Sequence, residues 1–247
     1  MHRSHRQCLQ FRFDKGRLPG MKMFGRWSLA ALATLAFAHS AHGQVLQSAV
    51  QAPAAAPGQT HADFTGQSVS ADSRRVADWV VRSGDNEGLP FMIVDKVDAK
   101  AFLFGPGGAL IAAVPVLLGL ARGDDSPAGI GDRPLALITP AERITPAGRF
   151  VAQLGLNLAG QDILWVDYAA AISVHRAADP KAGLTANGRL ARLASQSASD
   201  NRISHGCINV SVDFFERVLR PTFTRTSGIV YVLPETRSVR EVFPALV

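Results

Sequence analysis

A series of short apolar runs separated by turn residues constrains the fold more than any other feature of the chain. The runs have strand length and are rich in β-branched and aromatic residues. They cover residues 91–97, 101–104, 109–118, 149–154, 163–168, 170–175 and 229–233. The glycine-rich residues 105–108 lie between two runs and predict a hairpin turn. Many strands and few helical patterns predict a mainly β domain with a few peripheral helices around one core.

Helical spacing is limited to a few segments. Val76, Trp79 and Val80 lie at i, i+3 and i+4, which predicts a helix capped by Asp72 or Ser73. Residues 190–193 predict a short helix. Residues 213–220 place apolar side chains on one face and charges on the other, so we expect this helix to hold the preceding segment against the core.

The N-terminal region has the three parts of a secretory signal. Lys22 and Arg26 precede the apolar run 27–38, and small residues follow as far as Gly43. The run is too short for a stable membrane anchor. We therefore expect residues 1–43 to be a leader that is cleaved near Gln44, which places the mature protein in the periplasm or cell wall.

The leader also accounts for the basic charge of the chain. It holds seven of the 26 Lys and Arg and one of the 20 Asp and Glu, so 19 of each remain in the mature chain. A formal charge of zero gives no reason to expect nucleic-acid or membrane-surface binding.

Two further segments precede and interrupt the predicted domain. Residues 44–71 are rich in Ala, Pro and Gln without helical or strand period, which predicts a flexible spacer before a domain over 72–247. Residues 123–134 contain three aspartates but lack the alternating carboxylates and final glutamate of a calcium loop, so they predict a solvated turn.

Cys207 is the only cysteine that remains once the leader, which contains Cys8, is removed. In an oxidising compartment such a cysteine is buried and inert, paired with another molecule, or kept as a nucleophile. A nucleophilic thiol needs a base. Of the three histidines in the mature chain, His61 lies in the spacer and His205 is two residues from the cysteine, whereas His175 ends an apolar run. His175 is therefore the best candidate base.

The residues around Cys207 suggest how its reaction would be supported. Gly206 lets backbone approach a ligand closely, and the amides near Cys207 are candidates for an oxyanion hole. Ser204 and Asn209 either hold substrate or form the turn. A zinc site made by His175, His205 and Cys207 is a competing interpretation that no second cysteine or His pair supports, so we predict no metal.

Three elements in order resemble the L,D-transpeptidase family with a YkuD-type catalytic domain. They are residues 145–150 (TPAGRF, a TPxGxF element), residues 172–175 (ISVH) and residues 204–209 (SHGCIN). The resemblance covers roughly residues 91–234. It implies a YkuD-like fold, a β-sandwich or barrel-type catalytic domain with peripheral helices.

The resemblance also implies a mechanism and substrates. Cys207 would attack a peptidoglycan stem tetrapeptide, release its terminal D-Ala and form a thioester, with His175 as base. Ser204, His205, Gly206 and Asn209 would shape the site. An amine of a second stem peptide or of a protein would then accept the acyl group, without cofactor or metal.

Two other functions stay open at this stage. The same acyl-enzyme could be hydrolysed, which would make the protein an L,D-carboxypeptidase or endopeptidase. The domain could instead bind or organise the cell wall without catalysis, although the presence of both His175 and Cys207 argues against this.

Two residues and one interval depart from the common family pattern. Arg176 stands where many members have Gly after the histidine, and Asn209 stands where a large part of the family has Arg. The interval between His175 and Cys207 is also longer than usual, and its insertion could form a lid or alter the acceptor channel.

Overall fold

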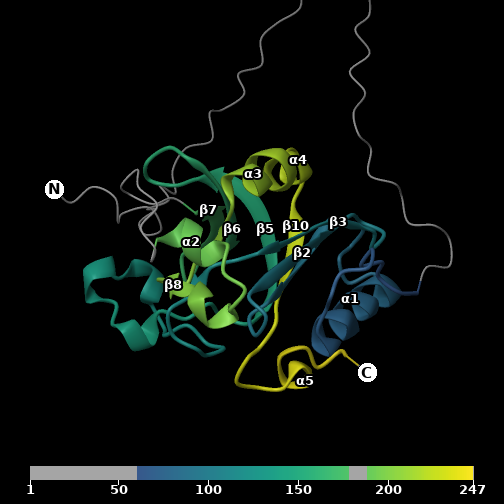
Figure 1. Cartoon of the computed structure of the whole chain (residues 1–247), viewed down its shortest axis with the longest axis horizontal. Coiled ribbons are helices and arrows are strands. Elements are labelled where there is room, and N and C mark those ends of the chain that lie inside the picture. Colours follow the sequence, from purple (N-terminus) through teal and green to yellow (C-terminus); the bar gives the residue numbers. More distant parts are fainter. Residues whose placement is uncertain (1–59, 178–187, 247) are drawn as a thin grey trace, which may run out of the picture. The chain divides into compact units, whose positions relative to one another are not determined.

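The computed structural model describes residues 60–177 and 188–246 (Figure 1), so the predicted leader and most of the predicted spacer lie outside the described residues. The strands are β1 Phe91–Asp95, β2 Lys100–Phe104, β3 Leu110–Pro115, β4 Leu118–Gly119, β5 Gly148–Leu156, β6 Asp162–Asp167, β7 Ile172–Arg176, β8 Arg202–Ser204, β9 Ile208–Val210 and β10 Gly228–Val232. The α-helices are α1 Ala71–Ser83, α2 Arg189–Leu193, α3 Val212–Phe214, α4 Arg220–Phe223 and α5 Val239–Val242. Single turns complete the set: η1 Ile130–Asp132, η2 Leu135–Leu137, η3 Pro140–Glu142, η4 Ala198–Asn201 and the π-helical η5 Phe215–Leu219.

Eight strands form one sheet in the order β3-β2-β1-β10-β5-β6-β7-β9, and β4 pairs with β8. The pairs β1–β10, β7–β9 and β4–β8 are parallel, and the other pairs are antiparallel. Leu117, just beyond β3, bridges to Asn209 of β9, so the two ends of the sheet meet almost completely. The prediction of a mainly β domain with few helices is confirmed.

The sheet has an apolar core on each face because alternate strand residues point to opposite sides. On one side, Met92 and Val94 of β1 join a core closed by α3, η5 and α4. On the other, Phe91 and Ile93 pack with α1 and the C-terminal segment. Figure 1 shows α1 and α5 on one side of the sheet and α3 and α4 at its opposite end.

The start of the domain differs from the prediction. Ser70, and not Asp72 or Ser73, caps α1, and its side chain accepts a hydrogen bond from the backbone N–H of Ser73. Phe64 is 3% exposed, and its ring meets that of Phe104 edge-on at 5.1 Å. The expected spacer boundary at residue 71 is therefore wrong for the described residues 60–70, because an isolated aromatic residue anchors this part of the segment in the core.

The helical segment that follows the cysteine packs as expected. Ser211 caps α3, and Phe214, Phe215 and Leu219 are buried in the core under the sheet. The helix widens to a π-helical turn before Pro221, which has no N–H to continue a regular ladder. This segment fixes the end of β9 and therefore the position of the cysteine turn that precedes β9.

Within the described residues, no helix combines the length and apolarity needed to span a membrane.

Candidate functional site

The parallel pair β7–β9 brings the predicted catalytic residues to one place. His175 lies opposite Asn209, and Val174 lies opposite Ile208. Cys207 directly precedes β9, so Cys207 and Asn209 share one side of the strand, as Ser173 and His175 do on β7. The register thus gathers these four side chains on one side of the sheet.

The hydrogen-bond partners of His175 define its tautomer. Nδ1 lies 3.0 Å from the Arg176 carbonyl oxygen, and Nε2 lies 2.9 Å from the Asn209 side-chain nitrogen. A carbonyl oxygen can only accept, so we assign the proton to Nδ1. Nε2 consequently carries the lone pair and accepts from Asn209.

Arg189 fixes the orientation of the Asn209 amide. The guanidinium Nε of Arg189, at the start of α2, donates to Asn209 Oδ1 at 3.3 Å. With the amide oxygen used in this way, the amide nitrogen faces His175. Asn209 therefore holds the histidine ring. This differs from both roles that the sequence suggested, which were to hold substrate or to form the turn.

The electrostatic surroundings keep His175 neutral. Burial lowers the pKa of His175 to about 4, and the charges of Arg189 and Arg176 add to this effect against the opposing hydrogen bond with the Arg176 carbonyl. A neutral imidazole with its lone pair on Nε2 is the form that can accept a proton at pH 7.

Arg176 acts on the site through its backbone carbonyl and the charge of its guanidinium, but its side chain does not enter the site. Its side chain points to the other side of β7, where it donates to Glu216 at 2.6 Å and to Asp162 at 2.8 Å. Its guanidinium also stacks 3.9 Å from the ring centroid of Phe215. An arginine after the histidine is thus accommodated without entering the site.

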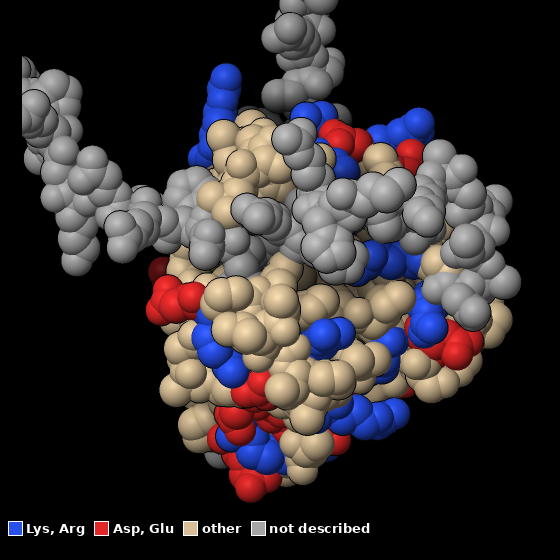
Figure 2. All heavy atoms as spheres, turned by 90° about the vertical axis from the view of Figure 1, so that its left-hand side faces the viewer, with Lys and Arg blue, Asp and Glu red and all other residues tan. Residues whose placement is uncertain are grey.

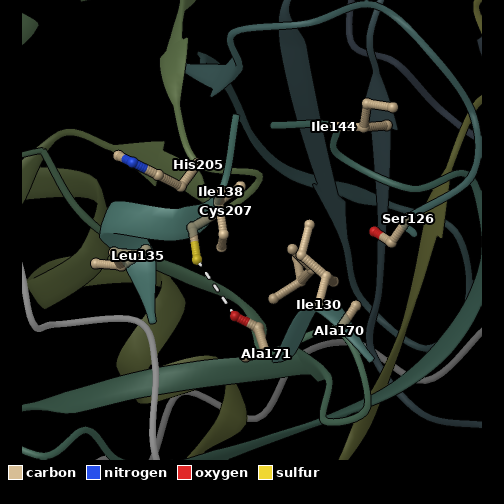
Figure 3. Close-up of a pocket in the computed structure, with 10 residues that line it drawn as sticks. Ser126, Ile130, Leu135, Ile138, Ile144, Ala170, Ala171, His205 and Cys207 are labelled. Carbon is tan, nitrogen blue, oxygen red and sulfur yellow. Dashed lines mark hydrogen bonds between the residues drawn. The ribbon is translucent and has the colours of Figure 1, made fainter. Parts of the chain in front are cut away.

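The sulfur of Cys207 is buried, with 3% of the residue exposed. It lies 3.6 Å from the Ala171 carbonyl oxygen (Figure 3) and 3.7 Å from the Ser173 hydroxyl. Neither ring nitrogen of His175 bonds to this sulfur within the described part of the chain. Cys207 is disulfide-bonded, and the partner lies outside the described residues.

The turn before β9 is held by Ser204 and Gly206. The Ser204 hydroxyl donates to the Cys207 carbonyl at 2.6 Å and accepts from the Gly206 N–H at 3.0 Å. Gly206 has φ +124°, and a Cβ there would lie 2.7 Å from the Ile144 carbonyl oxygen. Ser204 is thus a turn-forming residue, the second of the two roles considered for it, and only glycine fits at position 206.

An apolar pocket opens beside the cysteine (Figure 3). Ile130 of η1, Leu135 of η2, Ile138 and Ile144 line it together with Cys207 and His205. The expected solvated turn over 123–134 is therefore wrong in part, because Ile130 is buried and Asp124 is buried in an ion pair. His205 contributes to the pocket wall.

One side of the molecule carries charges of both signs (Figure 2). Figure 2 shows the side of the molecule that lies to the left in Figure 1, where Lys and Arg alternate with Asp and Glu among uncharged residues. Among the described residues, no group of three or more His, Cys, Asp or Glu side chains is placed to hold a metal ion.

Three residues of the site were not predicted as functional. Ser173 lies two residues before His175, and strand alternation alone would have placed it on the same side. Arg189 and Thr145 reach the site from distant parts of the chain. Local sequence carries no signal for such contacts, although Thr145 begins the TPxGxF element.

No family model and no curated protein sequence matches the chain. Similar solved structures include the helical cell shape determining protein Pgp2 of Campylobacter jejuni, with a TM-score of 0.40 and 14% identity over 72% of this chain and 62% of that chain. They also include the L,D-transpeptidase of Enterococcus faecium, with a TM-score of 0.30 and 17% identity over 58% of this chain and 49% of that chain. An NMR structure of the catalytic domain of an E. faecium L,D-transpeptidase has a TM-score of 0.28 and 17% identity over 58% of this chain and 96% of that chain. The chain spans less than two thirds of the length of the first two.

Proposed function

We propose that the mature protein is an exported cysteine L,D-transpeptidase that acts on peptidoglycan stem peptides in the periplasm or cell wall. The observation that carries the proposal is the β7–β9 register, which brings His175 and Cys207 to one side of two neighbouring strands, where Cys207 also lines a pocket. The resemblance of the SHGCIN and TPxGxF elements to the L,D-transpeptidase family supports the choice of substrate class.

The proposed reaction requires Cys207 in its reduced form. Cys8 is the only other cysteine of the chain and lies in the predicted leader. Removal of the leader would leave Cys207 as the single cysteine of the mature protein, and a thiol reductant would be needed to convert a disulfide at Cys207 into the reactive thiol.

The first half-reaction transfers an acyl group to sulfur. The thiol gives its proton to His175 Nε2, after rotation of the Asn209 amide has exposed that lone pair. The thiolate attacks the carbonyl carbon that precedes the terminal D-Ala of the tetrapeptide, and the oxygen becomes an oxyanion held by backbone N–H groups of the turn. Collapse of this intermediate breaks the C–N bond, and the departing D-Ala amine takes the proton back from His175.

The second half-reaction transfers the acyl group to an amine. The amine of a second stem peptide or of a protein attacks the thioester and loses a proton to His175. The C–S bond then breaks, and the sulfur recovers that proton. The energy of the original peptide bond is retained in the thioester, so no nucleotide triphosphate is consumed.

Product analysis tests the proposal. The full chain, reduced with a thiol reductant that is then removed, is mixed with purified disaccharide-tetrapeptide, and products are identified by mass spectrometry beside Cys207→Ala. Released D-Ala together with a cross-linked dimer, both absent in the variant, is the expected result. A tripeptide alone would instead identify a hydrolase. An inert parent chain would contradict the proposal and favour a non-catalytic wall-binding domain.

A further inference from the structure

Thr145 lies between the cysteine turn and β4. Its side chain is fully buried, its hydroxyl donates to the Gly206 carbonyl at 2.7 Å, and the same oxygen accepts from the Gly119 N–H at 2.9 Å. A carbonyl can only accept and an N–H can only donate, so the direction of both bonds is fixed. A single hydroxyl therefore ties the turn to a neighbouring strand.

The backbone of Thr145 is itself anchored by a buried ionic group. Its carbonyl accepts from the Lys96 ammonium at 2.9 Å, and the same ammonium lies 2.8 Å from Asp124 Oδ1. We refer to Lys96, Asp124, Arg202 and Glu235 as the Lys96 cluster, in which the ion-paired atoms of Lys96 and Glu235 are 3.7 Å apart. A buried cation held by three acceptors therefore fixes the position of the Thr145 backbone.

The bond to Gly206 orients a particular peptide group. The Gly206 carbonyl and the Cys207 N–H belong to one planar trans peptide unit, in which they point in opposite directions. Residue 144 also packs closely here, since a Cβ on Gly206 would meet the Ile144 carbonyl oxygen at 2.7 Å. With the carbonyl directed at Thr145, the Cys207 N–H is directed away from it.

We propose that Thr145 is a positioning residue that presets the Cys207 N–H to donate to the oxyanion formed when Cys207 attacks an acyl carbon. The inference rests on the proposed function, since it concerns the acylation step of that reaction. It goes further by assigning a mechanistic role to the threonine of the TPxGxF element. Thr145 touches neither substrate nor the reacting atoms and acts through the Gly206–Cys207 peptide.

The test compares two reactions of one sulfur. Acylation by disaccharide-tetrapeptide passes through an oxyanion, whereas alkylation by iodoacetamide is a displacement at an sp³ carbon and forms none. The full chain is used with Cys8→Ser in every protein, so that Cys207 is the only cysteine. Thr145→Val removes the hydroxyl at nearly constant volume, and Thr145→Ser retains it.

In Thr145→Val we expect kcat for acylation to fall about ten- to hundredfold, with KM nearly unchanged. This is at or below the lower end of the range of about 10²–10³ for outright loss of an oxyanion donor, because the Cys207 N–H is retained and only its orientation is loosened. Alkylation should stay within about twofold of the parent rate, because the sulfur itself is undisturbed. Thr145→Ser should recover most of the acylation rate. Thr222→Val is the matched control, because it removes a partly buried hydroxyl that donates to the Val218 carbonyl near α4. This variant should change neither rate.

Three outcomes would overturn the inference. They are parent-like acylation in Thr145→Val, an equal loss of acylation and alkylation, and failure of Thr145→Ser to recover activity. Should Thr145→Val not fold, Thr145→Ala provides a second chain without the hydroxyl, and the same divergence of the two rates is expected. An inert parent would be a different result, because it refutes the proposed function before any variant is compared.

Discussion

The side chain of Asn209 decides which nitrogen of His175 is basic. Its amide N–H donates to Nε2, and the Nδ1 N–H donates to the Arg176 carbonyl oxygen. Imidazole in the other tautomer would place an N–H against the amide N–H, which is unfavourable. A polar residue on β9 therefore prepares a base on β7.

The pH dependence of acylation should reveal the low pKa of His175. Burial lowers the pKa of this group to about 4, so the folded protein keeps the ring neutral down to that pH, whereas an exposed histidine would protonate near 6.5. We expect the acidic limb of the kcat/KM profile to fall near pH 4. Rates measured from pH 3.5 to pH 8 would locate it.

Arg189→Met provides the control for this assignment. The positive charge of Arg189 contributes to lowering the pKa of His175, so its removal should move the acidic limb to higher pH. A limb near pH 6.5 in the parent chain, or no movement in the variant, would contradict the account of His175.

Gly206 should tolerate no side chain. It combines φ +124° with a site where Cβ would lie 2.7 Å from a backbone oxygen, whereas Gly88 has φ +70° and open space around the same position. Both glycines have positive φ, but +70° lies in the left-handed helical region that other residues can adopt, so the comparison reports the steric contact at Gly206 together with its less accessible φ. We expect Gly206→Ala to lose about 1–3 kcal/mol more free energy of unfolding than Gly88→Ala, as measured by urea denaturation. Equal losses would show that the turn can relax.

At the scale of elements, the Lys96 cluster connects the end of β1 to the loop before η1 and to the segment after β10. The ammonium of Lys96 and the carboxylate of Asp124 have side chains that are 0% and 1% exposed. Asp124 also accepts from the backbone N–H groups of Glu235 and Thr236. One carboxylate thus joins parts of the chain more than a hundred residues apart.

Removal of the buried cation should destabilise the protein strongly. Lys96→Met leaves the Asp124 charge buried without its ammonium, a change that typically costs about 3–5 kcal/mol. Arg75→Met is the matched control, because it breaks an ion pair with Asp72 in which both side chains are about half exposed. Urea denaturation should show a large loss for the first variant and almost none for the second. Similar losses would mean that the cluster is not a stabilising anchor.

Elements were predictable where composition marks them locally. The seven apolar runs all contain strands, and the 105–108 turn joins β2 to β3. In contrast, β8 and β9 have three residues each and were not predicted, because so short a stretch shows no clear alternation. The parallel β7–β9 pairing depends on contacts across 34 residues, which local periodicity does not encode.

At the scale of the whole molecule, the sequence indicated a mainly β domain and a set of site residues, but not their arrangement. The roles of Ser204 and Asn209 became distinct only through hydrogen bonds: Ser204 holds backbone, and Asn209 holds His175. The packed domain begins before the predicted residue 72, because Phe64 packs against the rings of Phe102 and Phe104 in β2. Each of these features depends on long-range packing or on a single side chain in a segment of low complexity.

The central claim is that Cys207 carries the acyl group during turnover. The most direct test maps the acyl adduct by peptide mass spectrometry after acid quenching of the reduced Cys8→Ser chain with disaccharide-tetrapeptide. The account predicts an added mass equal to the donor less D-Ala, located on the peptide that contains Cys207, and weaker labelling in His175→Gln. An adduct on another residue, or D-Ala release that persists in Cys207→Ala, would contradict it.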